Sequence, residues 1–116
     1  MTTDPDCLFC KIAAGDIPAE IVARGTHSLA FRDVAPKAPT HVLVIPAEHI
    51  GSLAELAADH TELLADLVGV ANQVAVDEKL TGGYRVVTNV GPDAGQSVPH
   101  LHLHVLGGRG LGWPPG

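Results

Sequence analysis

The segment His100-Leu101-His102-Leu103-His104-Val105-Leu106 alternates histidines with aliphatic residues over its whole length. In a β-strand, successive side chains point to opposite faces, so the three imidazoles would share one face and the aliphatic side chains the other. With 7 histidines in 116 residues, such a triplet is expected by chance roughly 0.02 times, from the cube of the histidine frequency times the available starts. The segment therefore predicts a strand with one core face and one face for function. The bland alternatives are a polar sheet face or a purification tag, and a tag would not interleave leucines.

Four earlier segments also have the composition of strands. They are residues 20–24, 28–33, 40–45 and 84–89. Gly25-Thr26-His27 separates the first two segments, which indicates a hairpin, and Pro46 ends the third, which is rich in β-branched residues. A loop containing glycine and proline, residues 90–99, connects the fourth segment to the histidines. The chain is therefore expected to form an antiparallel sheet of about five strands.

Two helices are predicted, one short and one long. Residues 7–14 read as the short helix, ended by Gly15. Residues 52–55 and 59–62 each place Ser or Asp three positions before Glu, which is the pattern of a capping box and of a helix start. From the second start, one apolar stripe extends toward Gly82-Gly83 and consists of Leu63, Leu64, Leu67, Val68, Ala71, Val74 and Ala75. Helices that cover an antiparallel sheet give an α+β fold, and the length suits one domain over residues 1–116.

Composition and charge restrict the partners of the chain. A hydrophobic content of 46% with 17% charged residues suits a folded protein. The formal net charge of −6, from 13 acidic and 7 basic residues without a basic cluster, argues against a nucleic acid polymer as partner. A single phosphate is still possible, because a few backbone N–H groups and imidazoles bind it locally. The N-terminus lacks the pattern of a signal peptide and no apolar run approaches the ~20 residues of a membrane span, so we expect a cytoplasmic protein without a membrane partner.

The alternating histidines support two kinds of chemistry. A catalytic zinc usually needs a nearby carboxylate as base, and none lies between Gln96 and the C-terminus. An imidazole nucleophile attacks phosphorus and leaves again readily, because much of it is unprotonated near neutral pH. The preceding loop, residues 89–99, supplies amide and hydroxyl side chains, and its glycines let backbone N–H groups approach an oxyanion. The sequence therefore favours a histidine nucleophile, with no catalytic cofactor.

Cys7 and Cys10 are the only cysteines, and they form a Cys-x-x-Cys pair. In a reducing compartment this pair favours metal binding or redox work over a structural disulfide. A closed tetrahedral zinc site needs four ligands, so two histidines would have to complete it, and spacing does not choose among them. A redox role is the weaker alternative, because no βαβ pattern follows the pair. Two reduced cysteines packed as small hydrophobic side chains are the third reading.

Further motifs accompany the histidine segment over nearly the whole chain. They are Phe9-Cys10-Lys11-Ile12, Phe31-Arg32-Asp33-Val34-Ala35-Pro36, Pro39-Thr40-His41-Val42-Leu43-Val44-Ile45-Pro46, Gly95-Gln96-Ser97-Val98-Pro99-His100, Leu106-Gly107-Gly108-Arg109 and Trp113-Pro114-Pro115-Gly116. Together with the pattern His-φ-His-φ-His-φ-φ, they resemble the histidine triad (HIT) family and, within it, the Hint branch. The resemblance implies a HIT-like fold and a homodimer in which each protomer binds a purine nucleotide. It also implies a hydrolase or transferase that cleaves purine nucleoside phosphoramidates or related adenylates through a nucleotidyl-histidine intermediate and releases AMP.

The resemblance assigns roles to individual residues. His102 resembles the nucleophile, His104 a ligand of the phosphate oxygens, and His41 the fourth histidine of the catalytic site. Ser97 corresponds to a residue near the leaving group, and Asp33 to the residue that holds the ribose hydroxyls. The other implied nucleotide contacts are Asn89, Gly95 and Gln96 around the phosphate, and Phe9, Ile12, Ile17, Phe31, Val34 and Leu43 around the base. Arg32 stands where some family members have histidine.

The family also implies a structural metal site and several rival functions. In bacterial relatives that keep both cysteines, the zinc ligands correspond to Cys7, Cys10, His49 and His100. A dinucleotide polyphosphate hydrolase and a nucleotidylyltransferase are rivals within the family, but Ser97 and the Trp-Pro-Pro-Gly tail favour the Hint branch. That tail resembles an element that reaches toward the partner subunit's site. From another class, the chain could be a nucleotide-responsive binding protein with incidental hydrolysis.

Overall fold

Within residues 2–116, which the computed structural model describes, five strands form one antiparallel sheet. The strands are β1 (Ile21–Arg24), β2 (Ser28–Arg32), β3 (Thr40–Pro46), β4 (Tyr84–Val87) and β5 (Leu103–Gly107). Their order across the sheet is β1-β2-β3-β5-β4, and every neighbouring pair is antiparallel. The predicted α+β class and the sheet of about five strands are confirmed.

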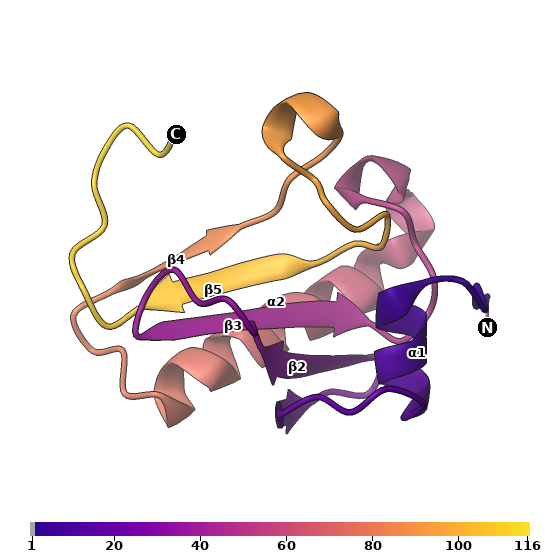
Figure 1. Ribbon diagram of the computed structural model, residues 1–116, viewed down its shortest axis with the longest axis horizontal. Helices are drawn as coiled ribbons and strands as arrows, with labels where there is room; N and C mark the ends of the chain where they lie inside the picture. Colours follow the sequence, from indigo (N-terminus) through magenta and orange to yellow (C-terminus); the bar gives the residue numbers. More distant parts are fainter. Residues whose placement is uncertain (1) are drawn as a thin grey trace.

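The sheet separates two hydrophobic cores, each completed by one α-helix (Figure 1). Helix α2 (Thr61–Asp77) lies behind the sheet in this view and packs through Leu67 and Val74 on Val42 and Val44 of β3. The short helix α1 (Leu8–Ala14) covers the opposite face near the ends of β2 and β3. Because side chains alternate along β3, its residues supply both cores, and all of them are buried. Helix α1 ends at Gly15 as predicted, where a φ of 84° favours glycine.

The start and end of α2 differ from the sequence prediction. The two capping-box patterns give only 3₁₀ turns, Leu53–Glu55 and Ala58–His60, and α2 begins at Thr61 without a side-chain cap. The helix ends at Asp77 because Lys79 adopts a left-handed conformation with φ 57°, well before the glycines at 82 and 83. Leu64 and Val68, expected in the buried stripe, are exposed, whereas Val70 is buried. No helix among residues 2–116 is long and apolar enough to cross a membrane.

The histidine segment forms a strand later than predicted. The His100 N–H donates to the Val98 carbonyl and the Leu101 N–H to the Ile50 carbonyl, so the backbone bends here and β5 begins at Leu103. The predicted division of faces nevertheless holds. Leu101, Leu103 and Val105 lie in the core with α2, while His100 and His102 contact Phe9 of α1 on the other side. The face for function is therefore the one that α1 covers.

Candidate active site and metal-binding cluster

A cavity of about 570 Å³ lies on the face of the sheet opposite α2. Its volume suits a small-molecule ligand, and most of its walls are apolar. Ten residues that the family resemblance assigns to the site line it: Phe9, Ile12, Ile17, Phe31, Asp33, Val34, Leu43, Ser97, His102 and His104. The polar side chains among them are few, as is typical of a pocket that binds a largely apolar group and orients it through a few polar contacts.

Other residues of the lining were not assigned by sequence reasoning. Three of them, Leu8, Arg32 and Val98, are next in sequence to assigned residues. This adjacency is the one feature of the sequence that could have pointed to them. Pro18, Ala19 and Glu20 come from the connection between α1 and β1, which carries no motif.

Asn89, Gly95 and Gln96 do not line the cavity. The Gln96 side chain accepts from the Gly91 N–H at 2.9 Å and donates to the carbonyls of Gly51 and Val98. It therefore braces its own loop, and Gly95 ends a 3₁₀ turn of that loop with φ 84°. Phosphate contacts from these three residues stay a prediction.

The buried imidazole of His102 has its tautomer fixed by the backbone. Its Nδ1 lies 2.7 Å from the His100 carbonyl oxygen. Because a carbonyl oxygen only accepts, Nδ1 carries the proton and Nε2 keeps a free lone pair. The ring also packs edge-on against Phe9, with centroids 5.2 Å apart and an interplanar angle of 88°. In its neutral form, His102 thus presents the lone pair of Nε2 in a fixed orientation in the wall of the cavity.

A second chain of hydrogen bonds orients the neighbouring histidines. The Lys37 N–H donates to His41 Nδ1 at 3.0 Å, so His41 carries its proton on Nε2. That nitrogen lies 2.9 Å from His104 Nδ1 and 3.4 Å from Asp33 Oδ2. His104 therefore accepts at Nδ1 and, when neutral, has its own proton on Nε2. The rings of His104 and His102 follow at a centroid distance of 5.1 Å.

The electrostatics of the site keep His104 and His41 neutral near pH 7. Burial and, to a smaller extent, the neighbouring His102 and His41 lower the pKa of His104 to about 4. Burial also lowers the pKa of His41, although the Asp33 carboxylate opposes this shift. His104 accordingly presents an N–H hydrogen-bond donor rather than a cation.

The side chains of Cys7, Cys10, His49 and His100 form a second cluster, whose members are possible metal ligands. Cys7 is the N-cap of α1 and Cys10 lies within it, while His49 follows β3 and His100 precedes β5. Their ligand atoms all lie within 4.8 Å of one another. The Cys7 and Cys10 sulfurs are 3.2 and 3.5 Å from His100 Nδ1, and the Cys10 sulfur is 3.3 Å from His49 Nδ1. Both cysteines are free thiols.

The donor set of this cluster fits zinc. Two sulfurs and two imidazole nitrogens are a common ligand set of closed structural zinc sites. His100 Nε2 donates to the Pro46 carbonyl at 2.9 Å, which leaves Nδ1 unprotonated toward the sulfurs. The predicted grouping of Cys7, Cys10, His49 and His100 is confirmed as a cluster compatible with structural zinc.

Asp33, His41 and His104 also bring three donor atoms within 4.8 Å of one another. Here His41 Nε2 carries a proton, because its Nδ1 already accepts the Lys37 N–H. A metal would have to displace the proton on His41 Nε2 and break the hydrogen bond from this nitrogen to His104 Nδ1. The arrangement is therefore better suited to relay and orient protons than to bind an ion.

Comparison with known proteins identifies the family. A family model described as scavenger mRNA decapping enzyme C-term binding matches residues 6–110. An uncharacterized HIT-like protein of Synechococcus elongatus is 53% identical over 111 residues, which cover 96% of this chain and 97% of the relative. The chain belongs to the HIT family.

Other HIT relatives match over similar lengths. A 14 kDa zinc-binding protein of Zea mays is 48% identical over 115 residues, covering 97% of this chain and 90% of that protein. The crystal structure of a HIT family hydrolase from Legionella pneumophila superposes with a TM-score of 0.93 at 51% identity, covering 96% and 100% of the two chains. A histidine triad nucleotide-binding protein from Candida albicans gives a TM-score of 0.80 at 34% identity, covering 94% and 83%. The HIT fold predicted from the sequence is confirmed.

Proposed function

We propose that this HIT chain is a hydrolase of the Hint branch that cleaves purine nucleoside 5′-phosphoramidates or related adenylates and releases AMP. The observation that carries the proposal is the fixed tautomer of His102, which leaves Nε2 free as a nucleophile in the wall of the cavity. The Legionella relative is described as a hydrolase and the Candida relative as nucleotide-binding, which supports both parts of the proposal.

The nucleotide would extend from the apolar walls of the cavity to the histidines. The purine would lie among the apolar side chains, which are Phe9, Ile12, Ile17, Phe31, Val34 and Leu43. The Asp33 carboxylate accepts one hydrogen bond, from the Ala35 N–H at 2.8 Å, and has further lone pairs for the ribose hydroxyls. This placement brings the α-phosphate to His102 and His104.

The reaction would proceed in two displacements at phosphorus. In the first, His102 Nε2 attacks, the bond to the leaving amine breaks, and Ser97 helps to protonate the amine. The Nε2–H of neutral His104, together with backbone N–H groups, stabilises the charge on the phosphate oxygens. In the second, water attacks phosphorus, the bond to His102 breaks and AMP leaves. No catalytic cofactor takes part in this scheme.

A panel of substrates tests the proposal against its rivals. We expect kcat/KM for adenosine 5′-phosphoramidate to exceed that for a diadenosine polyphosphate by about 100-fold, because Ser97 and the cavity serve an amine leaving group. AMP release is measured by chromatography, beside a titration of AMP binding. A faster reaction with the dinucleotide would favour the rival hydrolase. AMP binding without turnover of any substrate would leave a nucleotide-responsive binding protein.

We also propose that the chain forms a homodimer through the β4 edge of the sheet. β4 is an edge strand with a free ladder of hydrogen-bonding groups. Beside it, Tyr84 and Val86 of β4 and Leu64 and Val68 of α2 are between 40% and 47% exposed. The Tyr84 hydroxyl donates to Asn72 Oδ1 at 2.7 Å and so joins the two elements into one surface. Exposed apolar side chains next to an open edge are typical of an interface.

The C-terminal tail runs beside the same edge. Arg85 of β4 donates to the Gly112 carbonyl at 2.7 Å, and Trp113 is exposed. This position supports the proposal that the tail reaches toward the site of a partner subunit.

The two free thiols in the zinc-compatible cluster support the proposal of a reducing, cytoplasmic location.

The substitution Val68→Asp is expected to convert the dimer to a monomer, because a two-fold interface would bury two unpaired carboxylates. Sedimentation equilibrium at micromolar concentration measures the change in mass. Leu8→Lys is the matched control, since Leu8 is similarly exposed but lies on α1 across the sheet. A wild-type chain that sediments as a monomer would contradict the proposal, and so would a variant that stays dimeric.

A further inference from the structure

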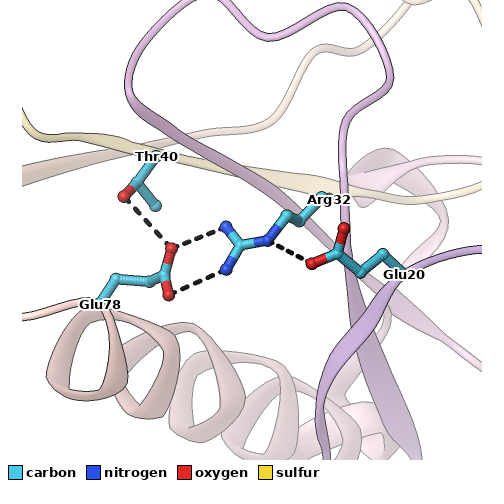
Figure 2. Close-up of polar contacts among 4 residues, drawn as sticks. All are labelled: Glu20, Arg32, Thr40 and Glu78. Atoms are coloured by element: carbon cyan, nitrogen blue, oxygen red, sulfur yellow. Dashed lines mark hydrogen bonds and ion pairs between the residues drawn. The ribbon is translucent and has the colours of Figure 1, made fainter.

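Arg32 and its partner Glu78 join four separate segments of the chain through two ion pairs and one hydrogen bond (Figure 2). Its two terminal nitrogens donate to both carboxylate oxygens of Glu78, at 2.7 and 3.0 Å, and its Nε donates to Glu20 at 2.9 Å. The Thr40 hydroxyl lies 3.4 Å from the same Glu78 carboxylate. Arg32 ends β2, Thr40 begins β3, Glu78 caps the C-terminus of α2, and Glu20 precedes β1. The end of the helix, the end of β2, the start of β3 and the residue before β1 therefore meet at the Arg32–Glu78 pair.

The pairing of Arg32 with Glu78 is strong for a pair near the surface. A two-pronged contact between guanidinium and carboxylate fixes geometry as well as charge. The Glu78 side chain is 22% exposed against 70% for Glu20, so solvent screens the Glu78 pair less. The hydrogen bonds from Arg32 lower the pKa of the Glu78 carboxyl, and the contact with Glu78 raises the pKa of Arg32. Both groups are therefore charged at neutral pH.

The position of Glu78 supports a positional role for the pair. An acid at the C-terminal end of a helix faces the negative end of the helix dipole, which disfavours the carboxylate. The cation of Arg32 offsets this repulsion and draws the end of β2 toward the end of α2. The pair thus fixes the end of the strand against a rigid 17-residue helix.

The clamped segments enclose the loop that carries the predicted ribose contact. Arg32 and Thr40 flank residues 33–39, so Glu78 contacts the chain on both sides of this loop. The loop contains Asp33, whose N–H donates to the His41 carbonyl at 3.0 Å. The position of the Asp33 carboxylate in the cavity therefore depends on the segment that Arg32 holds.

We propose that the Arg32–Glu78 ion pair is a positioning device that sets the preference of the site for ribonucleotides over 2′-deoxyribonucleotides. It holds Asp33 where the carboxylate accepts hydrogen bonds from the ribose hydroxyls. The inference rests on the proposed function, because the ribose contact of Asp33 belongs to that proposal. Arg32 acts through Asp33 and not on the reacting atoms.

The test compares Glu78→Gln with the wild type on AMP and 2′-deoxy-AMP. Glutamine keeps the shape of the side chain and removes the charge, so we expect the dissociation constant for AMP to rise about fivefold and that for 2′-deoxy-AMP, which keeps only the 3′-hydroxyl, to rise by less than about twofold. With the matching phosphoramidates, KM should follow the dissociation constants and kcat should change by less than about twofold. Asp77→Asn is the control, because Asp77 is the neighbouring acid of the same helix end and accepts its bond from Gln73, at 2.8 Å.

The outcomes separate this inference from the proposed function. A ratio of AMP to 2′-deoxy-AMP affinity that is unchanged in Glu78→Gln would overturn the inference, as would an equal weakening of both nucleotides. A wild type that binds both nucleotides equally would instead remove the ribose contact of Asp33 on which it depends. Arg32→Lys, which keeps the charge but loses the two-pronged contact, should reduce the ratio by an intermediate amount and serves if Glu78→Gln does not fold.

Discussion

The substitution His102→Ala is expected to abolish nearly all turnover while AMP binding is retained. It removes the Nε2 atom that would form the bond to phosphorus, and the other polar residues of the cavity stay in place. Single-turnover release of AMP should fall by at least about 1,000-fold, which is typical when a nucleophile is deleted. The dissociation constant of AMP should change by only a few fold, since the apolar walls and Asp33 are untouched.

A covalent intermediate gives this experiment a second readout. Quenching the wild-type reaction with alkaline denaturant should leave label from the substrate on the protein, because a phosphorus–nitrogen bond to histidine survives in base, and His102→Ala should leave none. His27→Ala is the matched control, because His27 is exposed in the turn between β1 and β2 and does not line the cavity. A His102→Ala chain that keeps activity within a few fold of wild type would refute the nucleophile assignment.

The parts of the fold that were predictable depend on local patterns. The sequence of β3 is rich in β-branched residues and has no interruption. In residues 100–106 histidines alternate with aliphatic residues, which indicates the two faces of the last strand. The end of α2 was not predictable, because it depends on the left-handed conformation of Lys79, which no residue type requires there. Leu64 and Val68 were assigned to the core because they are apolar and follow the helical spacing. The spacing does not show whether such side chains pack in the protein's own core or face a partner, and both are exposed.

The candidate site divides along the same line. The alternating histidines predicted a nucleophile. The tautomer of His102 was not predictable, because it depends on the His100 carbonyl oxygen, which the fold places 2.7 Å from His102 Nδ1. Spacing left the zinc ligands open, since Cys10, His49 and His100 come from segments far apart in the chain. Only the family resemblance chose them. The partner of Arg32 is likewise 46 residues away, so no sequence pattern linked it to Glu78.

Removal of zinc from the cluster of Cys7, Cys10, His49 and His100 is expected to destabilise the whole fold. In this cluster, α1 supplies both sulfurs and the segments next to β3 and β5 supply the nitrogens, so one ion would tie the helix to the sheet. Protein purified without a His tag should contain about one zinc per chain. Chelation should lower the melting temperature by about 10 °C or more, because the free energy of metal binding adds to the stability of the folded state.

Cys7→Ser shows whether the stabilisation comes from this cluster. The variant should bind little zinc and melt near the temperature of the chelated wild type, whereas the control His27→Ala should keep both metal and stability. We expect turnover to fall as well, because the backbone of the ligand His100 provides the carbonyl that orients His102. Metal content and melting temperature test the zinc site independently of activity.

A wild-type zinc content below about 0.2 per chain, unchanged in Cys7→Ser, would mean that the four residues are not a zinc site. Their packing would then have to be explained by the buried thiols and imidazoles alone, with His100 held by its bond to Pro46.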